Sequence, residues 1–311
     1  MKVVSLTEIE KVLPNIDPMP LIEDGFVDYS AGKCTIPPVG ELLMEKGDIH
    51  IKYGCSNGGD YYVVKIASGF YSNNEIGLPT SNGMMLLFDQ NTGMPAVILH
   101  DECYLTDVRT AVAGAISAKY LAPKNVKAIG IVGTGIQARM QLEYLKPVTD
   151  CKNVVVWGRN VQKAEQYKSD MEQKGYSVTV VTDLADLCEK ANLIVTTTPS
   201  EEVLITADMV KPGTHITAMG SDTLDKKELD PEILKMADKV VVDSVDQSET
   251  RGEIMWARKA GMITNDDIVE LGTVIANGGG RDNDDQITIA DLTGVAVQDL
   301  KIAEAVFKGL S

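Results

Sequence analysis

Three charged side chains occupy positions where charge is uncommon unless it has a task. Lys65 lies inside the apolar stretch YYVVKIASG, where strand alternation puts it on one face with Val63 and Ala67. Arg109 lies in the small-residue stretch LTDVRTAVAGA, and its planar guanidinium suits a carboxylate or a phosphate. Asp222 follows THITAMGS, a predicted strand whose carboxyl end would face a ligand in an open α/β sheet.

A small carboxylate-bearing substrate would suit these three groups. Arg109 could hold the carboxylate, while Asp222 or Lys65 could supply a proton to a reacting nitrogen. An ion pair between Asp222 and Lys65 would tune both groups. Each residue taken alone is equally compatible with a structural role, as half of a buried ion pair or as a helix cap.

The stretch IGIVGTGIQARM, residues 129–140, predicts a dinucleotide site. Gly133, Gly135 and Ala138 have the G-x-G-x-x-A spacing, directly after a predicted strand over 126–132 and directly before a predicted helix over 136–145. Such a turn brings backbone N–H groups and a positive helix N-terminus against a pyrophosphate. A plain strand-to-helix turn is the alternative, and the surrounding rhythm of strands and helices favours the dinucleotide site.

The residues after the next predicted strand, NVVVWG at 153–158, indicate which dinucleotide is bound. An acidic side chain there would accept hydrogen bonds from the ribose of NAD and repel the extra phosphate of NADP. The sequence has Gly158 at this position, followed by Arg159 and Asn160. A guanidinium suits a phosphate dianion, so we expect NADP(H) to be favoured over NAD(H). Stacking of Arg159 on adenine is the alternative and would serve either cofactor.

Two regions of the chain differ in how their predicted elements alternate. Residues 122–285 alternate strands with helices, so we expect an α/β fold with a doubly wound parallel sheet, a Rossmann domain. Residues 1–121 give neighbouring strands with short turns and then a helix over 104–122, which indicates a second, mixed α+β domain. The final segment, 286–311, gives one strand and one helix that we expect to return to this second domain.

Composition limits the classes of partner. The formal net charge is −16 and no basic stripe is visible, so we expect no nucleic-acid partner. No apolar run approaches the roughly 18 residues that span a bilayer, and MKVVSLTEIEKVL lacks a signal-peptide pattern, so we expect a cytoplasmic protein without a membrane partner. The five cysteines are scattered and the three histidines isolated, which predicts neither disulfides nor a metal site.

The sequence resembles the ornithine cyclodeaminase/μ-crystallin family over nearly its whole length. The segments that carry this resemblance are VVKIASGFYSNN, LLFDQNTG, LTDVRTAVAGAISAKYLAP, IGIVGTGIQARMQ, HITAMGSDTLDKKELDP and ITIADLTGVAVQDL. Members of the family reduce cyclic ketimines or α-imino acids, oxidise alanine, or cyclise ornithine to proline with loss of ammonia, always through hydride exchange with a nicotinamide. Within the family, DYYVVKIASGFY and the WGR turn are most similar to the branch found in ectoine-degradation gene clusters.

The resemblance implies a role for particular residues. Lys65 matches the family's substrate lysine, Arg109 its carboxylate-binding arginine and Asp222 its catalytic aspartate. It also implies a homodimer built by the domain over 1–121 and 286–311, which would bind a small α-imino or amino acid. The predicted cofactor-binding residues are Thr110, Gly133, Thr134, Gly135, Ile136, Gln137, Gly158, Arg159, Asn160 and Thr197.

Two positions near the expected substrate depart from the family pattern. Aligning through ELLMEKGDIHIKYG puts Glu41 near the place of a second carboxylate-binding arginine, so the pocket would lack one positive charge. The same alignment puts Lys52 where cyclodeaminases carry a glutamate for proton transfer. Both residues are therefore predicted at the substrate site, and Lys52 makes ornithine cyclisation the less favoured reaction.

Three functions are compatible with the sequence. The favoured one is NAD(P)H-dependent reduction of an α-imino acid or cyclic ketimine, or the reverse oxidation of an amino acid. The alternatives are deaminating cyclisation of a diamino acid on the same scaffold and a non-catalytic dinucleotide-binding protein. The presence of Lys65, Arg109 and Asp222 together argues against the non-catalytic alternative.

Overall fold

The computed structural model describes residues 1–310, the side chain at position 71 excepted, and divides them into two compact units. The first unit consists of Met1–Arg109 and the C-terminal segment that begins at Val295. The second unit is Thr110–Gly294. The unit boundary at Arg109 falls within the helix α3 (Tyr104–Leu121), so this helix contributes residues to both units.

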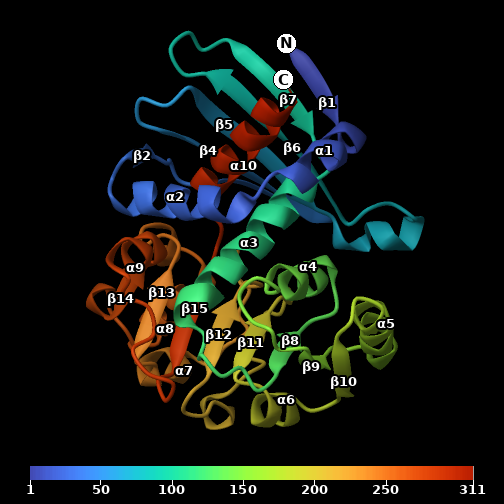
Figure 1. Cartoon of the computed structure of the whole chain (residues 1–311), viewed down its shortest axis with the longest axis vertical. Helices are drawn as coiled ribbons and strands as arrows, with labels where there is room; N and C mark the ends of the chain where they lie inside the picture. Colours follow the sequence, from blue (N-terminus) through green and yellow to red (C-terminus); the bar gives the residue numbers. More distant parts are fainter. Residues whose placement is uncertain (311) are drawn as a thin grey trace. The chain divides into compact units, whose positions relative to one another are not determined.

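A mixed seven-stranded sheet forms the centre of the first unit (Figure 1). Its strands are β1 (Lys2–Ser5), β2 (Cys34–Thr35), β3 (Gly40–Met44), β4 (Gly47–Ser56), β5 (Tyr61–Gly69), β6 (Ser81–Asp89) and β7 (Pro95–His100). The spatial order is β1-β7-β6-β5-β4-β2, with β3 also paired to β4, and only β1 and β7 run parallel. Its helices are α1 (Leu6–Val12), α2 (Pro18–Ser30) and α10 (Ala296–Gly309), with short 3₁₀ turns at Leu13–Asn15 and Tyr71–Ile76.

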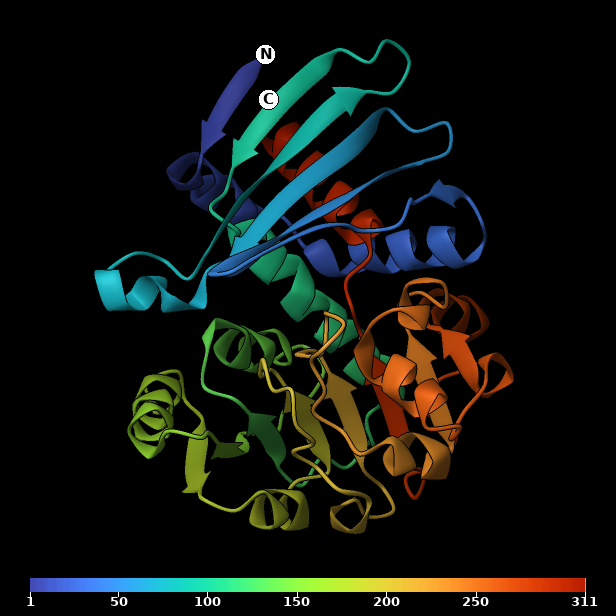
Figure 2. The ribbon, with the colours of Figure 1, turned by 180° about the vertical axis from the view of Figure 1, so that it is seen from behind.

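One face of this sheet is covered by α10, with α2 packed beside it (Figure 2). Strand alternation in β5 and β6 points Val63, Lys65 and Met85 to one face, where all three are buried. The residues between them, such as Val64 and Ile66, point to the opposite face and are only partly buried. Lys65 is therefore held on the covered face of the sheet by the same alternation that buries its apolar neighbours.

Eight parallel strands form the sheet of the second unit, in the order β10-β9-β8-β11-β12-β15-β13-β14. They are β8 (Ile129–Val132), β9 (Asn153–Trp157), β10 (Ser177–Val181), β11 (Leu193–Thr196), β12 (His215–Ala218), β13 (Lys239–Val242), β14 (Ile268–Glu270) and β15 (Thr288–Asp291). The α-helices are α4 (Ile136–Tyr144), α5 (Val161–Glu172), α6 (Leu184–Lys190), α7 (Pro231–Met236), α8 (Gly252–Lys259) and α9 (Leu271–Asn277). Short 3₁₀ turns lie at Ala207–Met209, Gln247–Glu249 and Asn265–Asp267.

Helices cover both faces of this parallel sheet. On one face α4 and α5 bury Leu142 and Tyr167 against the strands. On the other face α6, α7 and α8 bury Leu187, Ile233 and Ile254. This two-sided burial explains why the strands are apolar throughout and do not alternate between apolar and polar residues. The predicted fold class, a doubly wound α/β unit with a second mixed-sheet unit, is confirmed.

The assignment of the last strand to the first unit was wrong. The strand β15 pairs in register with both β12 and β13, so it fills the middle of the parallel sheet, and only α10 returns to the first unit. The two units accordingly divide at 109/110 and 294/295, whereas the sequence pattern predicted 121/122 and 285/286. A strand's periodicity does not specify its pairing partner, which depends on contacts with distant segments. The described residues, 1–310, contain no helix that combines the length and the apolar character needed to span a bilayer.

Candidate active site

A buried network joins Lys65 and Arg109 through an aspartate of α10. Asp299 has no exposed surface, and its Oδ1 accepts a hydrogen bond from Arg109 Nε at 2.9 Å. Its Oδ2 lies 3.6 Å from Lys65 Nζ. Arg109 Nη1 donates to Gln298 Oε1 at 3.2 Å. Two cations that are 2% and 6% exposed thus share one carboxylate, which offsets the cost of removing their charges from water.

Lys52 lies directly across from Lys65, because β4 and β5 pair antiparallel with these two residues opposite one another. Both side chains point to the covered face, and Lys52 is 6% exposed. Like charges opposite one another on neighbouring strands repel, so this pair is tolerated only where anions compensate. The structure therefore brings together Lys52, Lys65 and Arg109 as a cluster of buried cations within the first unit.

A second buried carboxylate, Asp101, lies near this cluster. It accepts a hydrogen bond from the backbone N–H of Leu105 at 2.9 Å, at the start of α3. Burial raises the pKa of Asp101 to about 6, and the negative charge of Asp299 raises it further while Lys65 lowers it. Below that pH the cluster gains positive character, because Asp101 becomes neutral.

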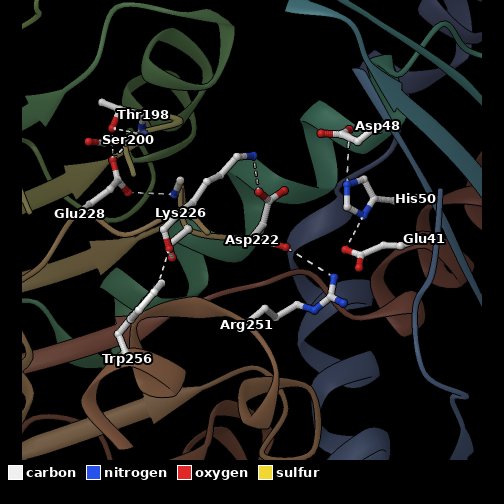
Figure 3. A network of polar contacts seen from close by, with 12 residues as sticks. Glu41, Asp48, His50, Thr198, Ser200, Asp222, Lys226, Glu228, Arg251 and Trp256 are labelled. Carbon is white, nitrogen blue, oxygen red and sulfur yellow. Dashed lines mark hydrogen bonds and ion pairs between the residues drawn. The ribbon is translucent and has the colours of Figure 1, made fainter. Parts of the chain in front are cut away.

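Glu41 faces a histidine of the neighbouring strand. It is opposite His50 on the paired strands β3 and β4, and its Oε1 lies 3.3 Å from His50 Nδ1 (Figure 3). On the other side of the ring, Asp48 Oδ1 lies 3.4 Å from His50 Nε2. Both ring nitrogens face a carboxylate, an arrangement in which the doubly protonated imidazolium can donate twice. The three residues form a polar cluster, with Glu41 on β3 and with Asp48 and His50 on β4, the strand that also carries Lys52.

Asp222 belongs to the second unit, in the loop after β12. Its Oδ1 accepts a hydrogen bond from Lys226 Nζ at 2.7 Å, and its side chain is 44% exposed (Figure 3). The loop is fixed by one contact of its own and one from α8, because the carbonyl oxygen of Lys226 accepts hydrogen bonds from Ser221 Oγ at 2.7 Å and from Trp256 Nε1 of α8 at 2.9 Å. Arg251 Nη1 lies 3.4 Å from the carbonyl oxygen of Asp222. The carboxylate of Asp222 is thus accessible on a fixed loop.

Glu228 ties this loop to the end of β11. Its fully buried carboxylate accepts hydrogen bonds from Thr196 Oγ1 at 2.6 Å, from the N–H and Oγ1 of Thr198 at 2.7 Å each, and from the N–H of Gly220 at 3.0 Å (Figure 3). Burial raises the pKa of Glu228, and the four donors lower it. This one side chain bridges the carboxyl ends of β11 and β12, which are also paired through their backbones.

The glycine turn between β8 and α4 has the geometry that a pyrophosphate requires. Gly133 has φ of 120°, and a Cβ built there would lie 2.5 Å from Thr197 Oγ1. Thr197 itself donates from Oγ1 to the carbonyl oxygen of Val132 at 3.0 Å. Gly135 is the N-cap of α4 without a capping side chain, and a Cβ built there would meet nothing within 4 Å. Backbone N–H groups at an uncapped helix start beside open space fit a dinucleotide phosphate.

The remaining predicted cofactor residues lie near the start of α4 or at the start of α5. Gln137 is linked to Thr110 through Gln141, whose Nε2 donates to the Thr110 carbonyl oxygen at 3.1 Å and to Gln137 Oε1 at 3.3 Å. Ile136 is exposed at the start of α4. Asn160 caps α5 by accepting from the N–H of Lys163 at 3.0 Å, and its neighbour at 159 is exposed.

Gly158 packs against the glycine turn itself. A Cβ built at this position would lie 2.6 Å from Thr134 Cγ2. A larger residue there, including the acid found in many NAD sites, would require Thr134 to move. Thr134 is also restrained by Arg139, whose Nη1 donates to the Thr134 carbonyl oxygen at 2.5 Å and whose Nη2 donates to Asp170 Oδ2 at 2.5 Å.

Gly133→Ala is expected to lower the free energy of unfolding by about 1–3 kcal/mol, since an L side chain is strained at this positive φ and would also press on Thr197. Chemical denaturation without dinucleotide measures the effect. Gly135→Ala is the matched control, because Gly135 has φ of −81° and open space beside it, so it should lose less stability than Gly133→Ala, only the amount by which alanine is a poorer N-cap than glycine. Equal losses in both variants would contradict the argument.

Sequence patterns missed the groups that connect the site. Asp299 was not predicted, although it lies at helical spacing with the buried residues Ile302, Ala303 and Val306, a signal that would have put its carboxylate on the buried stripe of α10. Gln298 and Asp101 carried no comparable signal. In the described part of the chain, no group of histidine, cysteine, aspartate and glutamate side chains could hold a metal ion.

Known proteins resemble this chain along its length. The model of the ornithine cyclodeaminase/mu-crystallin family matches residues 1–311. An uncharacterised cyclodeaminase of Sinorhizobium fredii, y4tK, is 37% identical over 315 residues, which cover 99% of this chain and 95% of the relative.

Solved structures at more than 25% identity share the fold, and two of them illustrate it. An archaeal alanine dehydrogenase dimer with bound NAD has a TM-score of 0.91 and 36% identity, covering 99% of this chain and 95% of that one. The Δ1-pyrroline-2-carboxylate reductase of Thermococcus litoralis, in complex with NADH and L-proline, has a TM-score of 0.92 and 28% identity, covering 99% and 97% of the two chains. The fold of this chain is thus one that binds nicotinamide dinucleotides in other proteins.

Proposed function

Because the chain belongs to the ornithine cyclodeaminase/mu-crystallin family, as the sequence predicted, we propose that it is an NAD(P)H-dependent oxidoreductase that reduces the C=N bond of an α-imino acid or a cyclic ketimine. The observation that carries the proposal is the buried network of Lys65, Arg109 and Asp299, which leaves an excess of positive charge for an anionic substrate. The alanine dehydrogenase and pyrroline-carboxylate reductase relatives support this reaction class.

The substrate carboxylate is assigned to the first unit. Arg109 donates hydrogen bonds from Nε to Asp299 and from Nη1 to Gln298, two residues of α10. Within the described residues, its Nη2 donates to no other group. Nη2 and the ammonium of Lys65 would bind one carboxylate, and this contact would orient the C=N carbon. Glu41 and Lys52 are proposed to line the same site, where Lys52 adds a further cation beside Lys65.

The proton is assigned to Asp222 of the second unit. Bound nicotinamide supplies the hydride that the imine carbon receives. The imine nitrogen must gain a proton in the same reaction, and the exposed carboxyl of Asp222 is the proposed donor, with Lys226 as its charged neighbour. In the reverse direction the same group would take a proton from an amine. Lys65 is the second candidate donor.

The dinucleotide is assigned to the glycine turn of the second unit. Gly133 and Gly135 would leave room for the pyrophosphate at the start of α4, with the other predicted cofactor residues around it. The proposed contacts are those of Thr110, Thr134, Ile136, Gln137, Gly158, Arg159, Asn160 and Thr197. A preference for NADP(H) over NAD(H) is part of the proposal, because residue 158 has no acidic side chain and Arg159 is exposed beside it.

Arg159→Ala should weaken NADPH binding by about 1–3 kcal/mol and barely change NADH binding, since only NADPH has the phosphate that a guanidinium would pair with. Calorimetric titration with each cofactor measures both values. Lys235→Ala, at an exposed position of α7, is a control for the loss of one surface cation. An unaltered protein that binds NADH more tightly, or a variant that loses both cofactors equally, would contradict the preference.

Oxidation of NAD(P)H, followed by its absorbance, tests the proposed reaction. The substrates are pyruvate, glyoxylate and oxaloacetate, each with ammonia or methylamine, and Δ1-pyrroline-2-carboxylate. Substrate-dependent oxidation supports the proposal, and no oxidation with any of them contradicts it. Ammonia release from ornithine or diaminobutyrate without net cofactor turnover would favour the cyclodeaminase alternative, which Lys52 opposite Lys65 disfavours.

A homodimer built by the first unit is the proposed assembly. The uncovered face of its sheet carries a row of apolar side chains from neighbouring strands, Tyr53, Val64, Leu86 and Ile98, none of which is fully buried. A second copy would bury this row, and one similar structure is a dimer. Light scattering that reports a monomer at micromolar concentration would contradict the dimer.

A further inference from the structure

We infer that Asp299 is a positioning residue of the substrate site, whose carboxylate fixes Lys65 and Arg109 so that both present charged donors to a single substrate carboxylate. The inference rests on the proposed function and adds a residue to its site. Asp299 is separated from Arg109 by 190 positions in sequence, and the two meet because the C-terminal helix α10 returns to the first unit.

Burial makes the charge of Lys65 depend on its neighbour Asp299. The side chains of Lys65 and Arg109 are 3% and 7% exposed, and that of Asp299 is fully buried. A buried lysine without a counter-ion loses its proton readily, since the low polarity around it disfavours the charged form. With Oδ2 of Asp299 at 3.6 Å, the ammonium of Lys65 is stabilised.

The same carboxylate helps to fix the plane of the guanidinium. Asp299 accepts a hydrogen bond from Nε of Arg109 and Gln298 accepts one from Nη1, two nitrogens on opposite sides of the group. A substrate carboxylate is then left with Nη2. Because the guanidinium is planar, these two contacts fix the direction in which Nη2 points.

The charges of the network match a substrate with one carboxylate. Lys52, Lys65 and Arg109 contribute three positive charges, and Asp299 and Asp101 contribute two negative charges above the pKa of Asp101, so the cluster carries a net charge of one positive unit. The titratable and charged groups near Lys65 on the elements around it are Lys52 of β4, Arg109 of α3, Asp299 of α10, and Asp101 and Cys103 after β7. Burial raises the pKa of the Cys103 thiol to about 12 and the pKa of Asp101 to about 6. Both values lie outside the range from about pH 7 to about pH 10.

Asp299→Asn separates this role from a purely structural one, because the amide keeps the shape and removes the charge. The probes are pyruvate and pyrrole-2-carboxylate, titrated calorimetrically into the protein with saturating NADH from about pH 7 to about pH 10. We expect the variant to bind each carboxylate at least about tenfold more weakly, the effect of losing a charge-assisted contact. Its affinity should also fall at a lower pH than that of the unaltered protein, since Lys65 loses its proton earlier, while NADH affinity stays the same.

Glu304→Gln on the same helix is the matched control, because it neutralises a half-buried carboxylate of α10 outside the network, and it should bind both probes normally. Equal probe affinities and parallel pH curves for Asp299→Asn and the unaltered protein would overturn the inference. So would an unaltered protein that binds neither carboxylate. If the unaltered protein binds the probes tightly, Asp299→Asn binds them weakly and no substrate is turned over, the inference is supported and only the proposed reaction is contradicted.

A double-mutant cycle covers the case in which Asp299→Asn is too unstable to titrate. Asp299→Asn leaves the buried ammonium of Lys65 without its counter-ion, and Lys65→Met removes that ammonium. The double variant Lys65→Met/Asp299→Asn should therefore unfold at a higher denaturant concentration than Asp299→Asn alone. Additive effects of the two substitutions on the unfolding midpoint would overturn the inference.

Discussion

Asp222→Asn is expected to lower kcat by about 10²–10⁴-fold, the usual contribution of a general acid, while the affinity for dinucleotide stays nearly unchanged. The amide keeps the size of the side chain but cannot deliver a proton to an imine nitrogen. Because Asp222 is 44% exposed and its loop is held by Ser221 and Trp256 through backbone contacts, the substitution should leave the unfolding midpoint unaltered. Steady-state kinetics with the best substrate of the panel measure the loss.

Asp225→Asn provides the control for Asp222→Asn. Asp225 is an exposed aspartate of the same loop, so its neutralisation changes the local charge equally without touching the proposed proton donor. Its kcat should match that of the unaltered protein. Comparable losses in both variants, or a nearly normal rate for Asp222→Asn, would remove Asp222 from the reaction and leave Lys65 as the proton donor.

Lys65→Met should lower kcat/KM by at least about 10²-fold, because the variant loses a charged contact to the substrate carboxylate and one of the two candidate proton donors. Methionine fills the same apolar surroundings next to Met85, so we expect the protein to fold. Asp299 keeps its hydrogen bond to Arg109 and does not become an isolated buried charge. Kinetics over a range of substrate concentration, with NAD(P)H titrated separately, measure the effect.

Lys46→Met is the corresponding control for the loss of a lysine, since residue 46 is exposed in the turn between β3 and β4. It should have normal kinetics. Should Lys65→Met retain most of its kcat/KM, the carboxylate must be held by Arg109 and Lys52 alone, and the central role given to Lys65 would be wrong. A loss of dinucleotide binding in Lys65→Met would point instead to a disturbance of the fold.

The sequence alone determined the features that depend on neighbours along the chain. Apolar stretches such as NVVVWG predicted buried strands, and the spacing of Gly133 and Gly135 predicted a turn that only glycine geometry permits, with φ of 120° at the first position. The alternation around Lys65 predicted a cation on a buried sheet face, where it lies. These inferences held because sterics and side-chain direction act over a few residues.

Only the tertiary structure decided which distant segments meet. The sequence pattern predicted a strand at β15. Its position between β12 and β13 follows from packing against segments that are tens of residues away. Asp299 lies in an ordinary amphipathic helix, and it becomes the counter-ion of Lys65 and Arg109 only because α10 covers the sheet. Long-range pairing is set by the burial of whole surfaces, and local periodicity does not contain that information.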